Sequence, residues 1–148
     1  MTTQQLTDEA AVRAVFDRLN RAWADADADA FAAEFTDDAD YVTWFGTYYR
    51  GRSDIATVHR PVFEKWQKGT RLDGEVVSVR FPTPDVALVH GLGAVVKPQR
   101  RRTARNTKVN LLVMVRQGAD WRIAAFHNTK RNWLLAKLSG RHEPTPVA

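Results

Sequence analysis

The sequence predicts an α+β domain in which three N-terminal helices cover one face of an antiparallel sheet. Apolar residues recur at helical spacing before residue 70, and one strand-like aromatic stretch interrupts them. After residue 70, four extended runs follow one another with turn signals between them. The length suits a single domain, residues 1–148. Hydrophobic residues make up 44% and charged residues 26% of the chain, which is the balance of a globular protein.

The first helix is predicted from Thr7 to Asp25, because its apolar residues form one stripe at helical spacing. Thr7 is the expected N-cap, and the acidic residues after it suit the positive end of the helix dipole. The alternating segment ADADADA then leads into a shorter helix, Ala28 to Phe35, which should bury Phe31 and Phe35. We interpret the repeated aspartates as a solvated face and not as a metal site.

The aromatic stretch from Thr36 to Arg52 is predicted to be the central strand of the ligand site. Asp37 and Asp38 favour a turn. The run from Tyr41 to Phe45 is β-branched and aromatic, which is typical of a strand. Gly46 should break this strand before a second, shorter extended piece. The stretch holds five aromatic residues, so it is the richest place in the chain for an apolar ligand: Tyr41, Trp44, Phe45, Tyr48 and Tyr49.

A third helix is predicted from Ser53 to Lys68, with Ser53 or Asp54 as N-cap and Gly69 after its end. Pro61 should kink or break this helix, because proline lacks a backbone donor. The four later strands are predicted at 71–81, 86–97, 106–116 and 121–129, with hairpin turns at 82–85 and 117–120. Residues 133–138 form a short apolar segment that could be helical, and residues 139–148 should be a mobile tail.

Several function classes are excluded or disfavoured. The chain has no cysteine, so disulfides and thiolate metal sites are excluded. The first ten residues lack the features of a signal peptide, and no apolar run reaches bilayer length, so we expect a cytoplasmic protein without membrane contact. No phosphate-binding glycine motif occurs, and the histidines lack metal-ligand spacing, so we expect no cofactor and no metal.

Three stretches resemble the NTF2-like (SnoaL-like) superfamily and, within it, the SgcJ/EcaC family: FTDDADYVTWFGTYYRGR, DVALVHGLGAV and WRIAAFHNTKR. The resemblance covers about residues 8–131. It implies a cone in which three helices pack on a strongly curved, mainly antiparallel sheet that encloses a pocket. It also implies a homodimer through the outer sheet face and a role in polyketide or enediyne natural-product (antibiotic) biosynthesis.

Isomerase members of this superfamily place a general-base aspartate on the first strand and an oxyanion-hole tyrosine on the first helix. Aligned on Asp37–Asp38–Ala39, the first position falls here at Thr43 and the second near Leu19. A threonine hydroxyl is no general base without a group that deprotonates it. We therefore reject steroid-isomerase chemistry for this chain.

Residues with polar or aromatic side chains on the predicted elements are the candidates for ligand contact. The histidines titrate near neutrality, and the asparagines Asn110 and Asn128 interrupt apolar strands. Each histidine can also be an ordinary core or rim residue, and His142 falls in the tail. No catalytic residue is assigned. The expected ligand-binding residues are Trp23, Tyr41, Thr43, Phe45, His59, His90, Asn110 and His127.

Two functions are consistent with these observations. The first is a pocket protein that binds or transforms a hydrophobic intermediate without a cofactor, through cyclisation, isomerisation or hydration. The alternative is a non-catalytic accessory module that docks to a synthase or an acyl carrier protein. Six basic residues and no acid lie in 97–108, and Arg100, Arg101, Arg102 and Arg105 are the candidate partner contacts. The more ordinary interpretation of this segment is a solvated hairpin tip. A nucleic-acid site would need stacking aromatics that the segment lacks.

The sequence also predicts a homodimer through the sheet. Leu112 and Met114 share one face of their strand, and Val109, Leu111, Val113 and Val115 share the other. Both faces are apolar, which suits a strand that is buried on two sides.

Overall fold

The computed structural model describes residues 2–139 and contains one six-stranded sheet in the order β2-β1-β6-β5-β4-β3. β1 pairs with β6 in parallel, and every other neighbouring pair is antiparallel. The elements are α1 (Thr3–Ala24), α2 (Ala28–Ala33), β1 (Phe35–Val42), β2 (Tyr48–Arg50), α3 (Arg52–Pro61), η1 (Val62–Trp66), β3 (Arg71–Thr83), β4 (Val86–Val96), β5 (Lys108–Gln117), β6 (Asp120–Lys130) and α4 (Trp133–Ser139).

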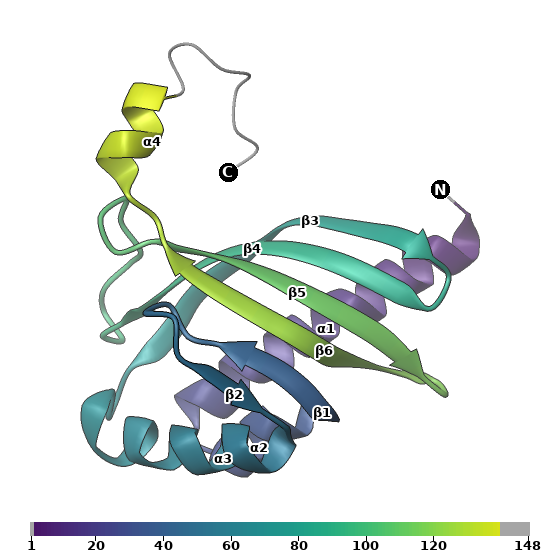
Figure 1. Ribbon diagram of the computed structural model, residues 1–148, viewed down its shortest axis with the longest axis horizontal. Helices are drawn as coiled ribbons and strands as arrows, with labels where there is room; N and C mark the ends of the chain where they lie inside the picture. The colour runs from purple at the N-terminus through teal and green to yellow at the C-terminus, as the bar shows by residue number, and fades with distance from the viewer. Residues whose placement is uncertain (1, 140–148) are drawn as a thin grey trace.

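The three N-terminal helices cover one face of the curved, open sheet, as Figure 1 shows, so the predicted α+β fold is confirmed. α1 packs against β3 and β6, and α3 packs against β1 and β2. α4 projects away from the sheet at one end of the molecule (Figure 1). Within residues 2–139, no helix is long and apolar enough to cross a membrane.

α1 begins earlier than predicted, and its N-cap is Thr2. The Thr2 hydroxyl accepts a hydrogen bond from the Gln5 backbone N–H, and the Gln5 side chain accepts one from the Thr2 backbone. This reciprocal capping box satisfies two free donors of the first turn. The prediction that Thr7 caps the helix was wrong, because Thr7 already lies inside it and donates to the Thr3 carbonyl.

α2 ends at Ala33, so the prediction that it continues to Phe35 was wrong. Phe35 is instead the first residue of β1, where it pairs with Ile123 and is completely buried. Asp37 and Asp38 also lie in β1, not in a turn as predicted. The strand tolerates them because their side chains are exposed and the β1–β6 register shifts between Phe35 and Asp40.

The predicted strand from Tyr41 to Phe45 ends early, at Val42. Residues 43–47 form a tight turn in which the Thr43 N–H donates to the Thr47 carbonyl and the Gly46 N–H donates to the Thr43 carbonyl. Gly46 has a φ of +93°, a conformation that side chains with a Cβ rarely adopt. Trp44 and Phe45 are therefore held at the tip of the β1–β2 hairpin.

α3 is capped by Gly51, not by Ser53 or Asp54 as predicted. The Arg52 guanidinium explains the earlier start, because it donates to the Phe35 carbonyl and pairs with Asp37 at 2.8 Å. The helix changes at Pro61 into the wider π-helix η1, which confirms the expected break. η1 ends at Trp66, three residues before Gly69, so the predicted end at Lys68 was wrong.

The four later strands lie within two residues of their predicted ends, and their two hairpin turns are confirmed at residues 84–85 and 118–119. α4 confirms a helix in the apolar segment after β6. The predicted tail lies outside the described residues except for Ser139, as does His142.

The two faces of β5 are both apolar, as predicted. Leu112 and Met114 are buried against the helices. Leu111, Val113 and Val115 point to the opposite, outer face and are half-buried. No described helix packs on that outer face.

Candidate functional site

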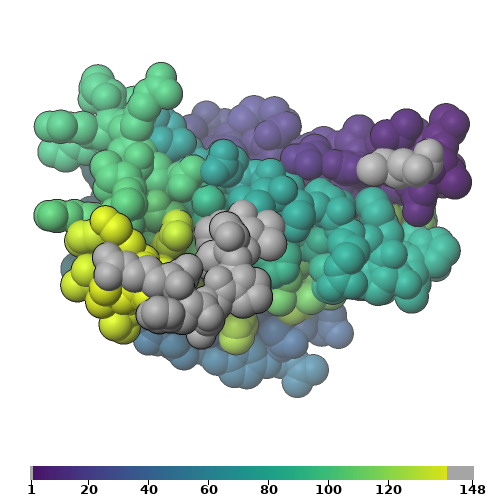
Figure 2. Space-filling view, turned by 90° about the horizontal axis from the view of Figure 1, so that it is seen from above, coloured from purple at the N-terminus to yellow at the C-terminus, as the bar shows by residue number. Residues whose placement is uncertain are grey.

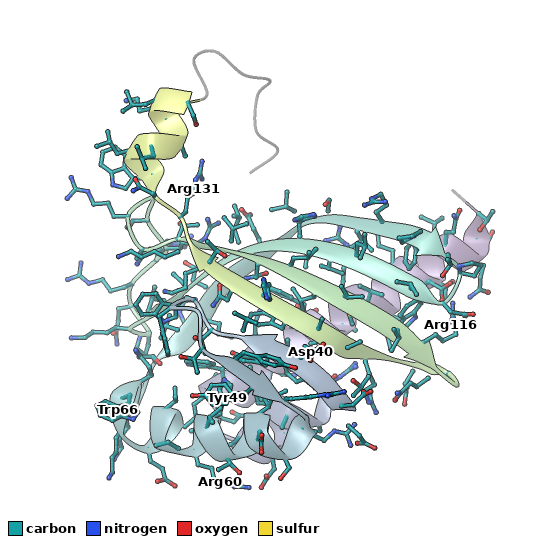
Figure 3. All side chains as sticks on the ribbon, in the orientation of Figure 1. Asp40, Tyr49, Arg60, Trp66, Arg116 and Arg131 are labelled. Carbon is teal, nitrogen blue, oxygen red and sulfur yellow. The ribbon has the colours of Figure 1, made fainter. Side chains whose placement is uncertain are left out.

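A cavity of about 810 Å³ lies between the sheet and the helices α1 and α3 with η1. Its volume is in the range that small-molecule sites occupy. Six elements and the β1–β2 turn contribute aromatic side chains to the wall, among them Phe16, Trp23, Phe31, Trp44, Tyr49 and Phe126. Trp66 stands at the end of η1, at the opposite end of the molecule from Arg116 (Figure 3). None of the described residues that line the cavity is Asp or Glu.

Six of the eight expected ligand-binding residues line this cavity: Trp23, Tyr41, Thr43, Phe45, His59 and Asn110. His90 and His127 do not. Both are exposed on the outer face of the sheet, where each is the register neighbour of Leu111. Alternation along β4 and β6 turns them away from the cavity.

Tyr41 and His59 form a hydrogen-bonded pair in the cavity wall. The Nδ1 of His59 lies 2.7 Å from the Ile55 carbonyl oxygen, which can only accept, so Nδ1 carries the proton. The neutral ring then presents the Nε2 lone pair to the Tyr41 hydroxyl, 3.3 Å away. The His59 ring also packs against Phe31, with ring centroids 4.4 Å apart. The turn of α3 that joins Ile55 to His59 therefore sets which nitrogen faces the cavity side.

Burial keeps both members of this pair neutral near pH 7. Burial lowers the pKa of His59, and the hydrogen bond to the Ile55 carbonyl opposes this only in part. Burial raises the pKa of Tyr41 well above its ordinary value. The pair therefore consists of a phenol that donates and an imidazole that accepts.

A polar group of three side chains occupies another part of the wall. Asn110 of β5 and Asn128 of β6 are direct register neighbours, and Lys108 precedes Asn110 by two residues on the same face. The Asn110 amide lies over Gly91, and a Cβ at residue 91 would collide with Asn110 Oδ1, so any larger residue there would displace the amide. Lys108 was not among the ligand contacts predicted from the sequence, because it belongs to the basic segment 97–108. Its spacing from Asn110 is the signal that would have placed it.

A second, more open hollow of about 450 Å³ lies outside the helices. Its charges neutralise one another: Arg52 pairs with Asp37 and Arg60 pairs with Asp29, each at 2.8 Å. Because these groups already satisfy each other, we take the aromatic cavity as the functional site.

The basic segment 97–108 is not uniformly solvated. The Arg102 backbone N–H donates to Asp73, and its guanidinium pairs with Glu75 at 2.8 Å. Arg105 lies over the Trp133 ring, 5.6 Å from its centroid. Arg102 and Arg105 thus hold the segment against β3 and α4.

Lys97, Arg100 and Arg101 are exposed and form no ion pair within residues 2–139, and unlike Arg105 they do not lie over a described aromatic ring. Figure 2 shows this part of the chain, in green, as a knob at the same end of the molecule as α4. These three residues are therefore the ones in this segment that are available to bind a negatively charged partner.

The comparisons with known proteins agree with this geometry. A family model described as a SnoaL-like domain matches residues 12–129. No curated protein shows significant similarity to the chain.

Several solved structures are similar. A Nostoc punctiforme protein, described as a domain of unknown function with a cystatin-like fold, is 34% identical; the match covers 94% of this chain and 85% of that one, with a TM-score of 0.80. An uncharacterised Caulobacter vibrioides protein with a cystatin-like fold is 26% identical over 90% of this chain and 96% of that one, with a TM-score of 0.70. A Novosphingobium aromaticivorans protein described as a candidate scytalone dehydratase is 13% identical over 88% and 89% of the two chains, with a TM-score of 0.73. The last likeness is one of fold alone.

Proposed function

This chain belongs to the SnoaL-like domain family, and on that premise we propose that its cavity binds a hydrophobic small molecule and transfers protons to or from it without a cofactor. One observation carries the proposal: an aromatic cavity of about 810 Å³ has the Tyr41–His59 pair in its wall. A family of this kind supports many chemistries on one fold, so the function rests on the site and not on the fold.

The Tyr41–His59 pair can accept a proton from a ligand and return it. A ligand hydroxyl that donates to Tyr41 Oη can pass its proton to Tyr41 while Tyr41 passes its own proton to His59 Nε2. The reverse transfer returns a proton to the ligand and restores the neutral imidazole. Since none of the described lining residues is a carboxylate, these two residues take the acid–base role.

The ligand class that we propose is a polyketide-type intermediate, of the kind handled by the SgcJ/EcaC family that the sequence resembles. A flat, conjugated molecule suits walls made of aromatic rings, because offset stacking and edge contacts add to the burial of apolar surface. Cyclisation, isomerisation and hydration of such a molecule each need proton transfer and no cofactor.

The test uses polyene and aromatic polyketide probes with the intact protein. Trp23, Trp44 and Trp66 line the cavity, so binding should change tryptophan fluorescence, and chromatography should detect any product. Tyr41→Phe and His59→Gln should retain binding and lose conversion. His127→Gln, an exposed histidine on the outer face, is the matched control and should behave like the parent. Absence of binding to every probe at high micromolar concentration would contradict the proposal.

The alternative function, docking to an acidic carrier protein, is favoured by the exposed residues Lys97, Arg100 and Arg101. Replacing Arg100 and Arg101 by alanine should weaken association with an acyl carrier protein at low salt, because exposed charges act mainly on the association rate and are screened by ions. Arg102 is left intact, since it holds Asp73 and Glu75. Surface plasmon resonance at two salt concentrations measures the effect.

The control for this experiment removes the same charge elsewhere, through Arg13→Ala with Arg21→Ala on the exposed side of α1. That variant should bind the carrier protein like the parent. If both double variants bind equally well at low ionic strength, the basic segment is a solvated tip.

We also propose a homodimer through the outer face of the sheet, where Leu111, Val113 and Val115 are half-buried in the single chain. Val113→Lys should therefore convert the protein into a monomer, because it places a charge in an apolar interface. Leu135→Lys on α4, at a residue that is 61% exposed, is the control and should leave the dimer intact.

Sedimentation velocity at tens of micromolar distinguishes the outcomes. A parent protein that sediments as a 16.8 kDa monomer would exclude the dimer. If Leu135→Lys dissociates the dimer and Val113→Lys does not, the interface lies on α4 and not on the outer face of the sheet.

A further inference from the structure

We propose that the cavity is built for a hydrophobic carboxylic acid, whose carboxylate is held by Lys108, Asn110 and Asn128 while its apolar body lies among the aromatic rings. This inference rests on the proposed function of the cavity and adds the chemical class of its ligand. Three features carry it: an uncompensated ammonium, two amides without partners, and the backbone geometry that holds them together.

The Lys108 ammonium is a half-buried cation without a counter-charge. No acidic side chain within residues 2–139 forms an ion pair with it, whereas Arg102 of the same segment pairs with Glu75. It lies 5.3 Å from the centroid of the Trp44 ring, so the β1–β2 turn covers it on one side. A cation that is partly removed from water and faces a cavity is stabilised when a ligand brings the opposite charge.

The electrostatics of the site agree with this assignment. Burial lowers the pKa of Lys108, and the neighbouring Lys130 lowers it further. Both causes disfavour the charged form of Lys108, and a bound carboxylate would offset both. The two lysines are register neighbours, and Lys130 is exposed.

The two asparagine amides make no hydrogen bond in the described part of the chain. Asn110 is only 8% exposed, and the Oδ1 atoms of Asn110 and Asn128 are buried without a donor. A carboxylate brings no donor for these two oxygens, so they do not by themselves identify the ligand. The NH₂ groups of the same two amides are the atoms that can donate to a carboxylate. The Lys108 ammonium also only donates, so the three side chains together suit a ligand group that accepts.

The geometry brings these donors to one place. The Asn110 amide lies across β4, with Oδ1 over Gly91 and Nδ2 towards Gly93, which lines the cavity. Asn128 is opposite Asn110 across the β5–β6 pair, and Lys108 is on the same face two residues away. One positive charge and two neutral amides match a singly charged carboxylate better than a doubly charged phosphate.

The experiment compares two probes of equal shape, 2-naphthoic acid and 2-naphthamide, by isothermal titration calorimetry at pH 7 and low salt. The acid should bind at least about tenfold more tightly than the neutral amide, because hydrogen bonds to a charged group are the stronger kind. Lys108→Met should abolish this preference, because it should lower the affinity for the acid much more than the affinity for the amide. Lys130→Met, which removes the exposed neighbouring charge, should preserve it.

A second measurement needs no variant. In the ¹⁵N-labelled parent protein, the side-chain NH₂ resonances of Asn110 and Asn128 should shift with the acid and much less with the amide. Equal affinities of the two probes, a preference that survives Lys108→Met, or unmoved asparagine resonances in the acid complex would each overturn the carboxylate site while the cavity function stands. If neither probe nor any polyketide binds, both proposals fall together.

Discussion

Replacing Phe35 by alanine should lower the free energy of unfolding by about 3–5 kcal/mol, the range for truncating a buried phenylalanine. Phe35 is 0% exposed and packs between Phe31 and Tyr41, with ring centroids 5.7 Å from each. It is also the residue through which β1 first pairs with β6. The cavity left by alanine cannot collapse easily, because rings on both sides are held by α2 and by β1. Urea unfolding followed by circular dichroism measures the change as a lower midpoint.

Phe45→Ala is the matched control, since it removes the same side chain from the tip of the β1–β2 turn. Phe45 is 63% exposed, so this variant should change stability by less than about 0.5 kcal/mol. It lines the cavity, however, and should weaken ligand binding. If Phe35→Ala and Phe45→Ala destabilise the protein equally, the packing of Phe35 between Phe31 and Tyr41 does not contribute the expected stability.

Stability should fall as the pH decreases below about 6.5, because His59 is held neutral by burial in the folded state. Its folded pKa lies below that of the unfolded chain, so the unfolded chain binds the proton first and gains stability as the pH falls. The loss begins near the unfolded pKa and stops once the folded imidazole also protonates. One group of this kind contributes at most about 1.4 kcal/mol per pH unit. Urea midpoints measured between pH 7 and 5 show the slope.

His59→Gln should flatten this part of the curve, and His127→Gln should not, since His127 is exposed. Asp8 acts in a separate, more acidic range. Its hydrogen bond from Arg116 lowers the pKa of the Asp8 carboxyl, so that contribution is lost only as the pH falls below about 3.8. A parent protein whose stability is constant from pH 7 to 5 would contradict the buried, neutral state of His59.

The β half of the fold could be predicted from the sequence because its strands alternate regularly and end at turn residues. The region from Phe35 to Phe45 could not. Two aspartates occupy strand positions there because a register shift leaves them exposed, and two large aromatics occupy a turn because Gly46 allows it. Local propensity favours the opposite in both places, and tertiary contacts decide.

The sequence shows which types of residue form the site, but not which of them face the cavity. Asn110 and His90 both interrupt apolar strands in the sequence, yet only Asn110 faces the cavity. Which face a residue occupies depends on the pairing between β4, β5 and β6, and a shift of one residue reverses every side chain. Lys108 was hidden by its basic neighbours, although it shares a face with Asn110.

The parallel pairing of β1 with β6 has a consequence for how the protein is made. Residues 35–42 can find their partner only after residues 120–130 have been synthesised. Until then the β1–β2 hairpin cannot join the rest of the sheet, whereas the β3–β4 hairpin can form from its own neighbours. Contacts between such distant parts of a chain form slowly, because a long loop must be closed first. The cavity should therefore be completed only after β6 has been synthesised, and until then we expect its aromatic wall to be accessible to chaperones.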